Sequence, residues 1–292
     1  MSASSTQRAL ITGGAGLIGE HLIETAATCA PGWEVLAPLR RELDLTNFKG
    51  VTAWFERERP DLVIHCAALS RVSACEANPT LARRVNVDLT RHLATLAAGV
   101  PFVFLSSDLV FDGAKGCYRE EDAVAPLHVY GRTKAEAEDV VRAHSCHLII
   151  RTSINYGHSR TGHRSFNEEI LQAWREGRPL TFFTDEFRSP LAAEITARAV
   201  WELAARGVTG VFHVAGAERL SRWDIGQLLL QRHPEYRALA RPGSFRDFQG
   251  PPRAADTSLD CAKAQALLSF RLPGFSEWIG KGNSNPQTPS PQ

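Results

Sequence analysis

The chain has 292 residues, 43% of them hydrophobic, so it is long enough for one large or two modest domains with a substantial core. Its 33 Lys and Arg residues balance 32 Asp and Glu, which argues against nucleic acid or an anionic membrane as a partner. Six scattered cysteines without a Cys-x-x-Cys pair argue against a zinc site and against a disulfide framework.

The ends of the chain bear on where the protein is expected to work. The N-terminus has no basic segment followed by a long apolar stretch, and no window approaches the roughly 20 apolar residues of a membrane span. The cytoplasm is the expected location, with no membrane partner. Residues 281–292 are rich in Pro, Ser, Asn and Gln and are expected to form a disordered tail. The ten histidines show no paired ligand spacing, so no metal site is expected.

The first predicted unit is a strand, a glycine turn and a helix. The apolar run Arg8–Thr12 enters a turn that holds Gly13, Gly16 and Gly19, and apolar residues then recur at helical spacing. Gly13 allows a tight turn, Gly16 lets the backbone approach a pyrophosphate, and Gly19 allows close packing of helix on strand. The position of this turn favours dinucleotide binding over an ordinary glycine-rich loop.

The residues after the second predicted strand, Glu34–Ala37, bear on the choice of cofactor. The strand runs into Arg40 and Arg41 instead of ending in an acidic residue. An acidic residue there binds the ribose 2′-hydroxyl of NAD, whereas arginine accommodates the 2′-phosphate of NADP. The sequence therefore favours NADP and leaves NAD open. Asp44 is interpreted either as an acceptor for the adenine amino group or as a cap for the following helix.

A buried strand is predicted at Asp61–Cys66, before two small residues, Ala67 and Ala68, that would let a cofactor lie across the strand ends. A helical pattern then covers residues 79–98. Asn86 is the polar residue in that apolar context, and a buried amide needs hydrogen-bond partners. Asn86 is therefore expected either to hold the structure together or to brace the nicotinamide.

Polar residues at strand ends are the candidates for contact with a substrate. Ser70 and Arg71 follow the third predicted strand, and Ser107 follows the apolar run Phe102–Leu105. Open α/β sheets gather ligands outside the carboxyl ends of their strands. Ser70 and Arg71 are therefore candidate substrate contacts, with an exposed loop as the alternative. Ser107 is a candidate for the reacting centre.

Tyr130 and Lys134 form the clearest chemical pair. If a helix begins near Val129, their spacing of four places the phenol and the ammonium on one face. A nearby positive charge favours phenolate, so the Tyr130 pKa is expected to be lowered. Such a tyrosine can pass a proton near neutral pH. Ser107, Tyr130 and Lys134 are thus predicted to converge.

The alternation of strands and helices predicts the fold class. A fifth strand is expected at His147–Arg151, and the rhythm indicates right-handed βαβ units in a Rossmann-type doubly wound parallel sheet. After Gly157 the regularity loosens. Helices are expected there at about 166–175, 192–205 and 223–230, and strands at 180–183 and 211–214.

Two domains are expected from this pattern. A dinucleotide-binding domain covers residues 1–157, and a smaller substrate-binding lobe, interleaved with the end of the sheet, covers residues 158–280. Arg188, in a loop of this lobe, is a candidate contact for a substrate phosphate or sugar.

Several motifs, in this order, resemble the extended short-chain dehydrogenase/reductase family: Thr12-Gly13-x-x-Gly16-x-x-Gly19, the Ser107 strand end and Tyr130-x-x-x-Lys134. Further motifs resemble its dTDP-4-dehydrorhamnose reductase branch, namely Ser106-Ser107-Asp108-x-Val110-Phe111-Asp112-Gly113, Tyr118-x-Glu120, Pro126-Leu127, Tyr130-Gly131-x-Thr133-Lys134, Arg151-Thr152-x-x-x-Tyr156-Gly157 and Ser258-Leu259-Asp260. The resemblance covers about residues 8–275. This branch also resembles the regulatory β subunit of methionine adenosyltransferase, a non-catalytic protein that keeps the NADP-binding fold.

The resemblance implies a reductase that sends a hydride from a nicotinamide to a ketone carbon of a nucleotide-linked sugar. It implies that Tyr130 donates the proton, that Lys134 holds the nicotinamide ribose and tunes Tyr130, and that Ser107 hydrogen-bonds the reacting oxygen. The expected cofactor contacts are Gly13, Gly16, Leu17, Ile18, Gly19, Arg40, Arg41, Asp44, Leu45, Cys66, Ala67, Ala68, Asn86, Ser106, Tyr130, Lys134 and Thr152. The expected substrate contacts are Ser70, Arg71, Ser107, Asp108, Tyr130, Asn155 and Arg188.

Two other functions stay open. One is an epimerase or dehydratase of the same fold with tightly held NAD, and the other is a non-catalytic, NADP-binding regulatory subunit. A homodimer is left open as well. Leu109 stands where the branch usually has Tyr, and residues 233–252 match nothing in it, so the sequence does not identify the sugar.

Overall fold

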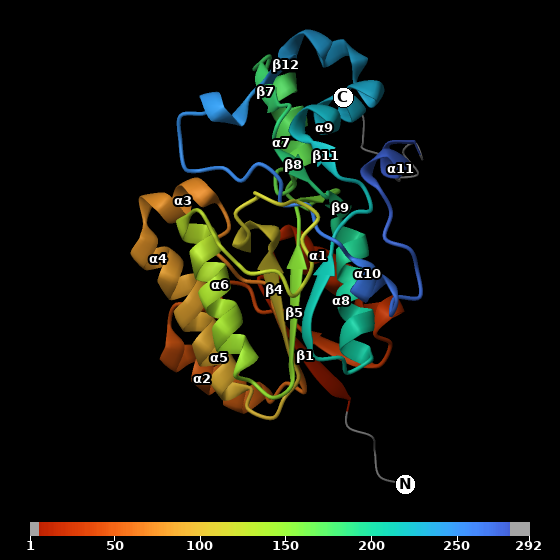
Figure 1. Ribbon diagram of the computed structural model, residues 1–292. Coiled ribbons are helices and arrows are strands. Elements are labelled where there is room, and N and C mark those ends of the chain that lie inside the picture. The colour runs from red at the N-terminus through yellow and green to blue at the C-terminus, as the bar shows by residue number, and fades with distance from the viewer. Residues whose placement is uncertain (1–5, 281–292) are drawn as a thin grey trace.

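The structure is a computed structural model that describes residues 6–280. The tail predicted at residues 281–292 lies outside the described residues. A parallel sheet flanked by helices forms one half of the molecule, and a smaller lobe of helices and short strands lies beyond the carboxyl ends of its strands (Figure 1).

The central sheet has six strands, and every neighbouring pair is parallel. Its strands are β1 (Gln7–Thr12), β2 (Trp33–Leu36), β3 (Leu62–His65), β4 (Phe102–Ser107), β5 (His147–Thr152) and β10 (Gly210–Val214). Their order across the sheet is β10-β5-β4-β3-β1-β2. The predicted class, a doubly wound α/β sheet of the Rossmann type, is confirmed. Because β2 and β3 lie on opposite sides of β1, the order reverses beside β1, where such sheets bind ligands.

Helices cover both faces of the sheet because successive side chains of each strand point to opposite sides. Ala9 and Ile11 of β1 belong to the core under α1 and α8, whereas Leu10 belongs to the core under α2, α5 and α6. Figure 1 shows these two helical layers on either side of the sheet. The helices are α1 (Leu17–Cys29), α8 (Ala193–Ala205), α2 (Phe48–Glu58), α5 (Leu89–Leu96) and α6 (Val129–Arg142).

The lobe has its own apolar core, built around buried Tyr156, Trp174 and Phe182. Its elements are β6 (Asn155–Tyr156), α7 (Phe166–Arg175), β7 (Leu180–Phe183), β8 (Phe187–Arg188), β9 (Leu191–Ala192), β11 (Leu220–Ser221), α9 (Arg222–Arg232), β12 (Ala240–Gly243) and α11 (Phe275–Gly280), with 3₁₀ turns at Pro234–Leu239 and Phe245–Asp247. α10 (Ala262–Gln265) returns to the sheet beside β10. Strand β10 lies in the main sheet although its residues stand between two parts of the lobe in sequence.

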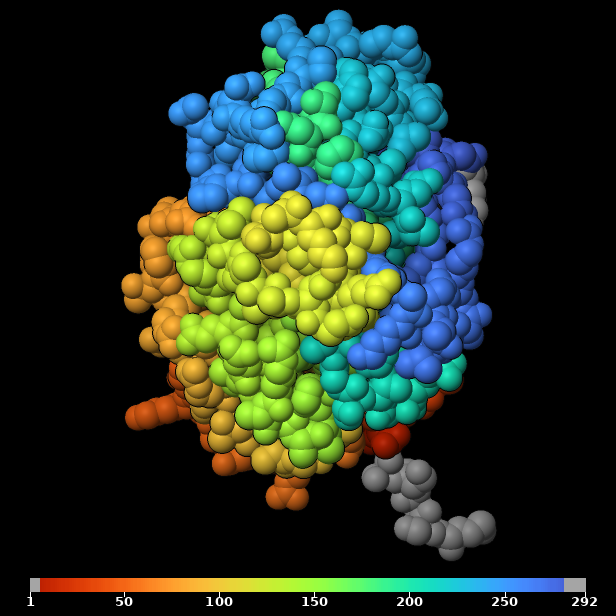
Figure 2. Space-filling model, in the orientation of Figure 1, coloured from red at the N-terminus to blue at the C-terminus, as the bar shows by residue number. Residues whose placement is uncertain are grey.

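The segment after β4 seals the boundary between the two halves. It begins with a 3₁₀ turn at Asp108–Val110 and then pairs with residues near the end of the chain: the backbone of Tyr118 bonds that of Ser258 and Asp260. Figure 2 shows this yellow segment at the centre of one face, packed against the blue segment. The carboxyl end of β4 is therefore covered by residues from both halves.

Several element boundaries differ from the predictions. Strands β4 and β5 extend beyond the predicted runs to Ser107 and Thr152, and Ser107 lies at the carboxyl end of its strand, as predicted. The helix predicted at 79–98 is interrupted, because α4 (Pro79–Arg83) passes through a π-helical turn, Arg84–Asp88, into α5; a short helix α3 (Val72–Ala77) precedes it. Within residues 6–280 we find no helix with the length and apolar character of a membrane span.

Candidate functional site

The predicted catalytic residues come from two adjacent elements, β4 and α6. Ser107 is buried at the end of β4, and Tyr130 and Lys134 lie one turn apart at the start of α6. A hydrogen bond with Ser107 acts on the phenol of Tyr130 and lowers its pKa in part. The structure therefore brings Ser107 and Tyr130 together at the carboxyl edge of the sheet.

Lys134 is buried beneath this edge. Its Nζ donates to the carbonyl of Leu105 at 2.5 Å and lies 3.9 Å from the ring centroid of Phe104. Burial lowers the pKa of Lys134 to about 7, and the nearby charge of Glu138 opposes that change. Lys134 can therefore gain or lose a proton near neutral pH.

The predicted lowering of the Tyr130 pKa is wrong. Burial is the largest influence and raises the pKa of Tyr130 above its usual value, and the negative charge of Asp108 raises it further. The expectation failed because spacing along a helix does not report how many protein atoms surround the phenol. At neutral pH Tyr130 is therefore a neutral phenol, which is a proton donor.

His128 caps the helix that carries Tyr130. Its side chain is buried, and its Nδ1 accepts a hydrogen bond from the backbone N–H of Gly131 at 3.0 Å. Burial lowers the pKa of His128; the carboxylate of Glu76 opposes this and the charge of Arg188 adds to it. Because only an unprotonated Nδ1 can accept, the cap requires neutral His128.

His128→Asn is expected to reduce the sensitivity of the fold to acid. Since the folded pKa of His128 lies below its unfolded value, unfolding takes up a proton as pH falls below about 6.5, and stability decreases. Asparagine keeps a capping oxygen and removes this proton uptake. The melting temperatures of both proteins from pH 8 to pH 5 should therefore diverge, with wild type losing more. His128→Ala, which removes the cap at every pH, should lose about 1 kcal/mol even at pH 8.

Asn86 lies in the π-helical turn and clasps the loop after β3. Its Oδ1 accepts from the N–H of Leu69 at 2.8 Å, and its Nδ2 donates to the Leu69 carbonyl at 3.1 Å and to Thr133 Oγ1 at 2.9 Å. Of the two predicted roles, the structure places Asn86 in the first, where it joins this loop to α6. Contact with a nicotinamide stays a prediction.

The glycine turn forms a tight cradle at the start of α1. Gly13 has φ +74°, and a Cβ there would lie 2.7 Å from the N of Ala67. A Cβ on Gly19 would meet the carbonyl oxygen of Gly13 at 2.2 Å, so helix and strand pack as predicted for this turn. No side chain among the described residues caps the N-terminus of α1, which leaves its first amides for an anion. These features fit the pyrophosphate of a dinucleotide.

The loop after β2 presents Arg40 and Arg41 to solvent. Asp44 does not cap α2, because Asn47 occupies that position and Asp44 accepts from the backbone and hydroxyl of Thr46 instead. These hydrogen bonds lower the pKa of Asp44 and keep it ionised. One oxygen is therefore already engaged, and an adenine contact stays a prediction.

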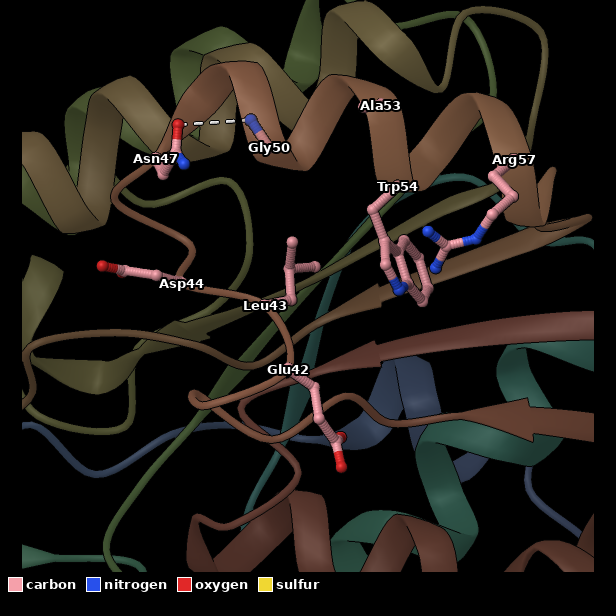
Figure 3. Close-up of a pocket in the computed structure, with 8 residues that line it drawn as sticks. All are labelled: Glu42, Leu43, Asp44, Asn47, Gly50, Ala53, Trp54 and Arg57. Atoms are coloured by element: carbon pink, nitrogen blue, oxygen red, sulfur yellow. Dashed lines mark hydrogen bonds between the residues drawn. The ribbon is translucent and has the colours of Figure 1, made fainter.

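A pocket of about 280 Å³ lies beside this loop, between it and α2 (Figure 3). The indole of Trp54 and the side chain of Leu43 point into it, and Asp44 points away. Arg57, at its rim, is paired with Glu58. None of the predicted catalytic residues lines this pocket.

A larger pocket of about 820 Å³ lies between the sheet half and the lobe. Its lining residues are Arg71, His163, Phe166, Glu169, Ile170, Gln172, Ala173, Arg178, Leu180, Phe182, Arg222, Ile225 and Arg253. The lining holds four arginines and one glutamate, so it is suited to an anion, and its aromatic and aliphatic residues are suited to a flat ring. Arg71 and Glu169 form a 2.6 Å ion pair between the two halves.

Sequence reasoning missed the three residues that organise this pocket. Glu186 is fully buried, pairs with Arg222 at 2.9 Å and accepts from Nε and Nη2 of Arg253. The charges of these arginines hold the pKa of Glu186 at about 2 although burial acts in the opposite direction. The residues are 67 positions apart at the extremes, and no local pattern in the sequence indicates that they meet.

Arg188 was predicted to lie in a loop, but it lies in the strand β8, where it is 3% exposed. Its guanidinium is shared between Thr257, Glu186 and Asp108. Asp108, a predicted substrate contact, is 2% exposed, and both of its oxygens already accept protein hydrogen bonds. Arg188 and Asp108 are therefore both buried and bonded to other protein groups, and their contact with substrate stays a prediction.

Other predicted contacts are also partly engaged. The hydroxyl of Ser106 donates to Glu138 at 2.5 Å, so its side chain faces α6. The amide of Asn155 donates to Thr152 and accepts from Thr196. Of the remaining predicted contacts, Ser70 is exposed, and Leu17, Ile18, Leu45, Cys66, Ala67 and Ala68 are half-buried.

Within residues 6–280 we find no cluster of three or more His, Cys, Asp or Glu side chains able to hold a metal ion.

Comparisons with known proteins find relatives over most of the chain. Residues 7–282 match the family model described as the RmlD substrate binding domain. A dTDP-4-dehydrorhamnose reductase from Sinorhizobium fredii is 32% identical over 90% of this chain and 93% of its own length. Methionine adenosyltransferase 2 subunit beta from Xenopus laevis is 27% identical over 90% and 83%. A dTDP-4-dehydrorhamnose reductase from Bacillus anthracis, solved in complex with NADP, has a TM-score of 0.85 at 24% identity over 94% of this chain and 98% of its own.

Proposed function

The chain belongs to the family of the RmlD substrate binding domain, and from that premise we propose that it is an NADPH-dependent reductase of a keto group on a nucleotide-linked sugar. The observation that carries the proposal is the position of Ser107 and Tyr130. They meet at the carboxyl edge of the sheet, and a separate pocket between the sheet half and the lobe, which neither residue lines, is rich in arginine. Membership of the short-chain dehydrogenase/reductase family, with domains at 1–157 and 158–280, is part of this proposal.

The proposed chemistry divides hydride and proton transfer between cofactor and protein. NADPH, when bound, supplies the hydride. Tyr130, neutral at pH 7, donates the proton to the ketone oxygen, and the hydroxyl of Ser107 stabilises negative charge on that oxygen. Lys134, with a pKa of about 7, stands one turn behind Tyr130 and favours its deprotonation when charged.

The arginine-lined pocket is the proposed place for the nucleotide part of the substrate. Arg222 and Arg253 share one buried carboxylate, Glu186, so the cluster retains positive charge toward the pocket. A guanidinium group can bind two phosphate oxygens at once through two parallel hydrogen bonds. Phe166 and Phe182 offer apolar surface for a base or sugar ring. A pyrophosphate-linked sugar would place its ketone toward the strand end.

The test is an assay of NADPH oxidation in the presence of dTDP- and UDP-linked 4-keto sugars. The readout is the loss of absorbance of the reduced nicotinamide. We expect turnover with at least one keto-sugar nucleotide and none with the free sugar. Retention of NAD through purification, with turnover that needs no added cofactor, would favour the epimerase or dehydratase class instead.

A second candidate is a non-catalytic regulatory subunit, which the likeness to the methionine adenosyltransferase 2 subunit beta supports. Its expected signature is binding of NADP without oxidation of NADPH by any keto-sugar nucleotide, together with co-purification of a partner enzyme. The presence of Ser107, Tyr130 and Lys134 together favours the reductase.

The double variant Arg40→Ala/Arg41→Ala is expected to weaken NADP binding by about 10–100-fold, because charged hydrogen bonds to the 2′-phosphate are lost. NAD binding should stay within about twofold of wild type. Thermal shift titrations with both cofactors measure this, since a ligand raises apparent stability by an amount that grows with the logarithm of its concentration over its Kd. Arg206→Ala, which removes an exposed arginine paired with Glu202 at the end of α8, is the matched control and should change neither. Greater stabilisation of wild type by NAD than by NADP would overturn the preference for NADP.

The expected location and assembly complete the proposal. All six cysteines are unpaired in the structure, which suits a reducing compartment, and we propose the cytoplasm. A homodimer is the proposed assembly, to be measured by sedimentation.

A further inference from the structure

Asp108 has partners that are unequally divided between its two oxygens. Oδ2 accepts from Ser153 Oγ at 2.8 Å and from Thr257 Oγ1 at 2.9 Å, and it lies 3.8 Å from Nε of Arg188. Oδ1 accepts from Ser107 Oγ at 3.1 Å. Most of the donors thus gather at the oxygen that faces away from Ser107.

The bond between Ser107 and Asp108 limits what Ser107 can do. A carboxylate only accepts, so the single hydroxyl proton of Ser107 is directed to Asp108. The oxygen of Ser107 meanwhile accepts from the N–H of Leu109 at 3.1 Å. While Ser107 donates to Asp108, it has no proton for a substrate oxygen or for the phenol of Tyr130, whose pKa it lowers when it donates there instead. It must turn away from Asp108 before it can donate one.

Arg188 is the cation behind Asp108. Its Nη1 donates a hydrogen bond to Thr257 Oγ1 at 2.5 Å, and the hydroxyl of Thr257 in turn donates one to Oδ2 of Asp108. Hydrogen bonds in such a chain strengthen one another. On its other side Arg188 lies 3.3 Å from Glu186, which fixes it to the lobe. Arg188 therefore draws the charge of Asp108 toward Oδ2.

We propose that Arg188 is a positioning residue for the Ser107 hydroxyl. By holding the negative charge of Asp108 at Oδ2, directly and through Thr257, it weakens the hydrogen bond that Oδ1 accepts from Ser107, so that Ser107 can donate to a ketone oxygen instead. The long Ser107–Asp108 separation of 3.1 Å agrees with a weak bond. This inference rests on the proposed function, because it concerns the proton that Ser107 offers to a ketone oxygen.

The test is a set of kinetic cycles at saturating substrate. Arg188→Met should lower kcat about tenfold, while the Kd for NADPH stays within about twofold. Arg188→Lys keeps the charge and should stay within about threefold of wild type. Adding Asp108→Asn, which replaces the competing carboxylate by a weaker acceptor, should restore most of the kcat lost in Arg188→Met. In a Ser107→Ala background, Arg188→Met should cause no further loss.

A structural role for Arg188 would give the opposite pattern. Losses that add in the Ser107→Ala background, or a failure of Asp108→Asn to restore kcat, would overturn the proposal. If Arg188→Met does not fold, Thr257→Val removes the relaying hydroxyl and should show the same loss and the same restoration by Asp108→Asn.

A readout without turnover separates this inference from the proposed function. If wild-type protein oxidises no NADPH, the reductase assignment fails. The melting temperatures of the same variants then test whether Arg188 and Asp108 interact. Asp108→Asn should then recover part of the melting temperature lost in Arg188→Met. Simple addition of the two losses would show that Arg188 and Asp108 do not act as a pair.

Discussion

Tyr130→Phe is expected to lower kcat by about 10²–10⁴-fold, the usual contribution of a positioned proton donor. The substitution removes one oxygen, and Phe fills the same space at the start of α6, so the fold should be retained. NADP should bind to the variant within about twofold of wild type. Steady-state oxidation of NADPH and a thermal shift titration with NADP measure the two quantities.

Tyr236→Phe is the matched control, since Tyr236 lies in the 3₁₀ turn of the lobe, far along the chain from the reacting groups. It should leave kcat unchanged. Equal activity of Tyr130→Phe and wild type would remove Tyr130 from the mechanism. Activity lost together with NADP binding would point to a damaged fold instead.

Arg151→Met is expected to lower the free energy of unfolding by about 3–5 kcal/mol, the largest effect on stability that we predict. Glu138 and Arg151 are 0% and 1% exposed and form two hydrogen bonds, at 2.9 and 2.7 Å, between α6 and β5. The variant would leave the Glu138 carboxylate buried with Ser106 and Arg142 as its remaining partners. Urea unfolding followed by circular dichroism measures the change.

Two comparisons isolate the buried charge. Glu138→Gln/Arg151→Met removes both charges and should lose less than Arg151→Met alone. Glu136 lies on α6 as well, and Glu136→Gln, which breaks its exposed pair with Arg83 of α4, should cost no more than about 1 kcal/mol. If the exposed and buried changes cost the same, burial would not be the reason for the effect.

Local patterns were sufficient to predict the elements of the sheet. The apolar run before Gly13, the helical spacing after it and the repeated alternation of strand and helix depend on neighbours in sequence, and they predicted the class of fold that was found. The same local logic placed Tyr130 and Lys134 in the first turns of a helix starting at Val129. Local patterns did not predict the π-helical turn at Arg84–Asp88. This turn carries Asn86, whose hydrogen bonds go to the backbone of Leu69 in another segment of the chain.

The protonation state of Tyr130 could not be obtained in this way. Its spacing from Lys134 indicated a lowered pKa, but burial among atoms from several segments raises it. Spacing reports which charges are near, whereas desolvation depends on everything packed around the group.

The sequence by itself determined a parallel, doubly wound sheet, a glycine cradle and a Ser, Tyr and Lys set, since each is encoded by residues that are close together or at strand ends. Only the tertiary structure decided that Arg188 and Asp108 are buried partners, and that Arg222 and Arg253 meet at Glu186. These contacts join segments up to 149 residues apart, as in the hydrogen bond from Thr257 to Asp108. Such pairings have no local signature because they are fixed by how the lobe packs on the sheet.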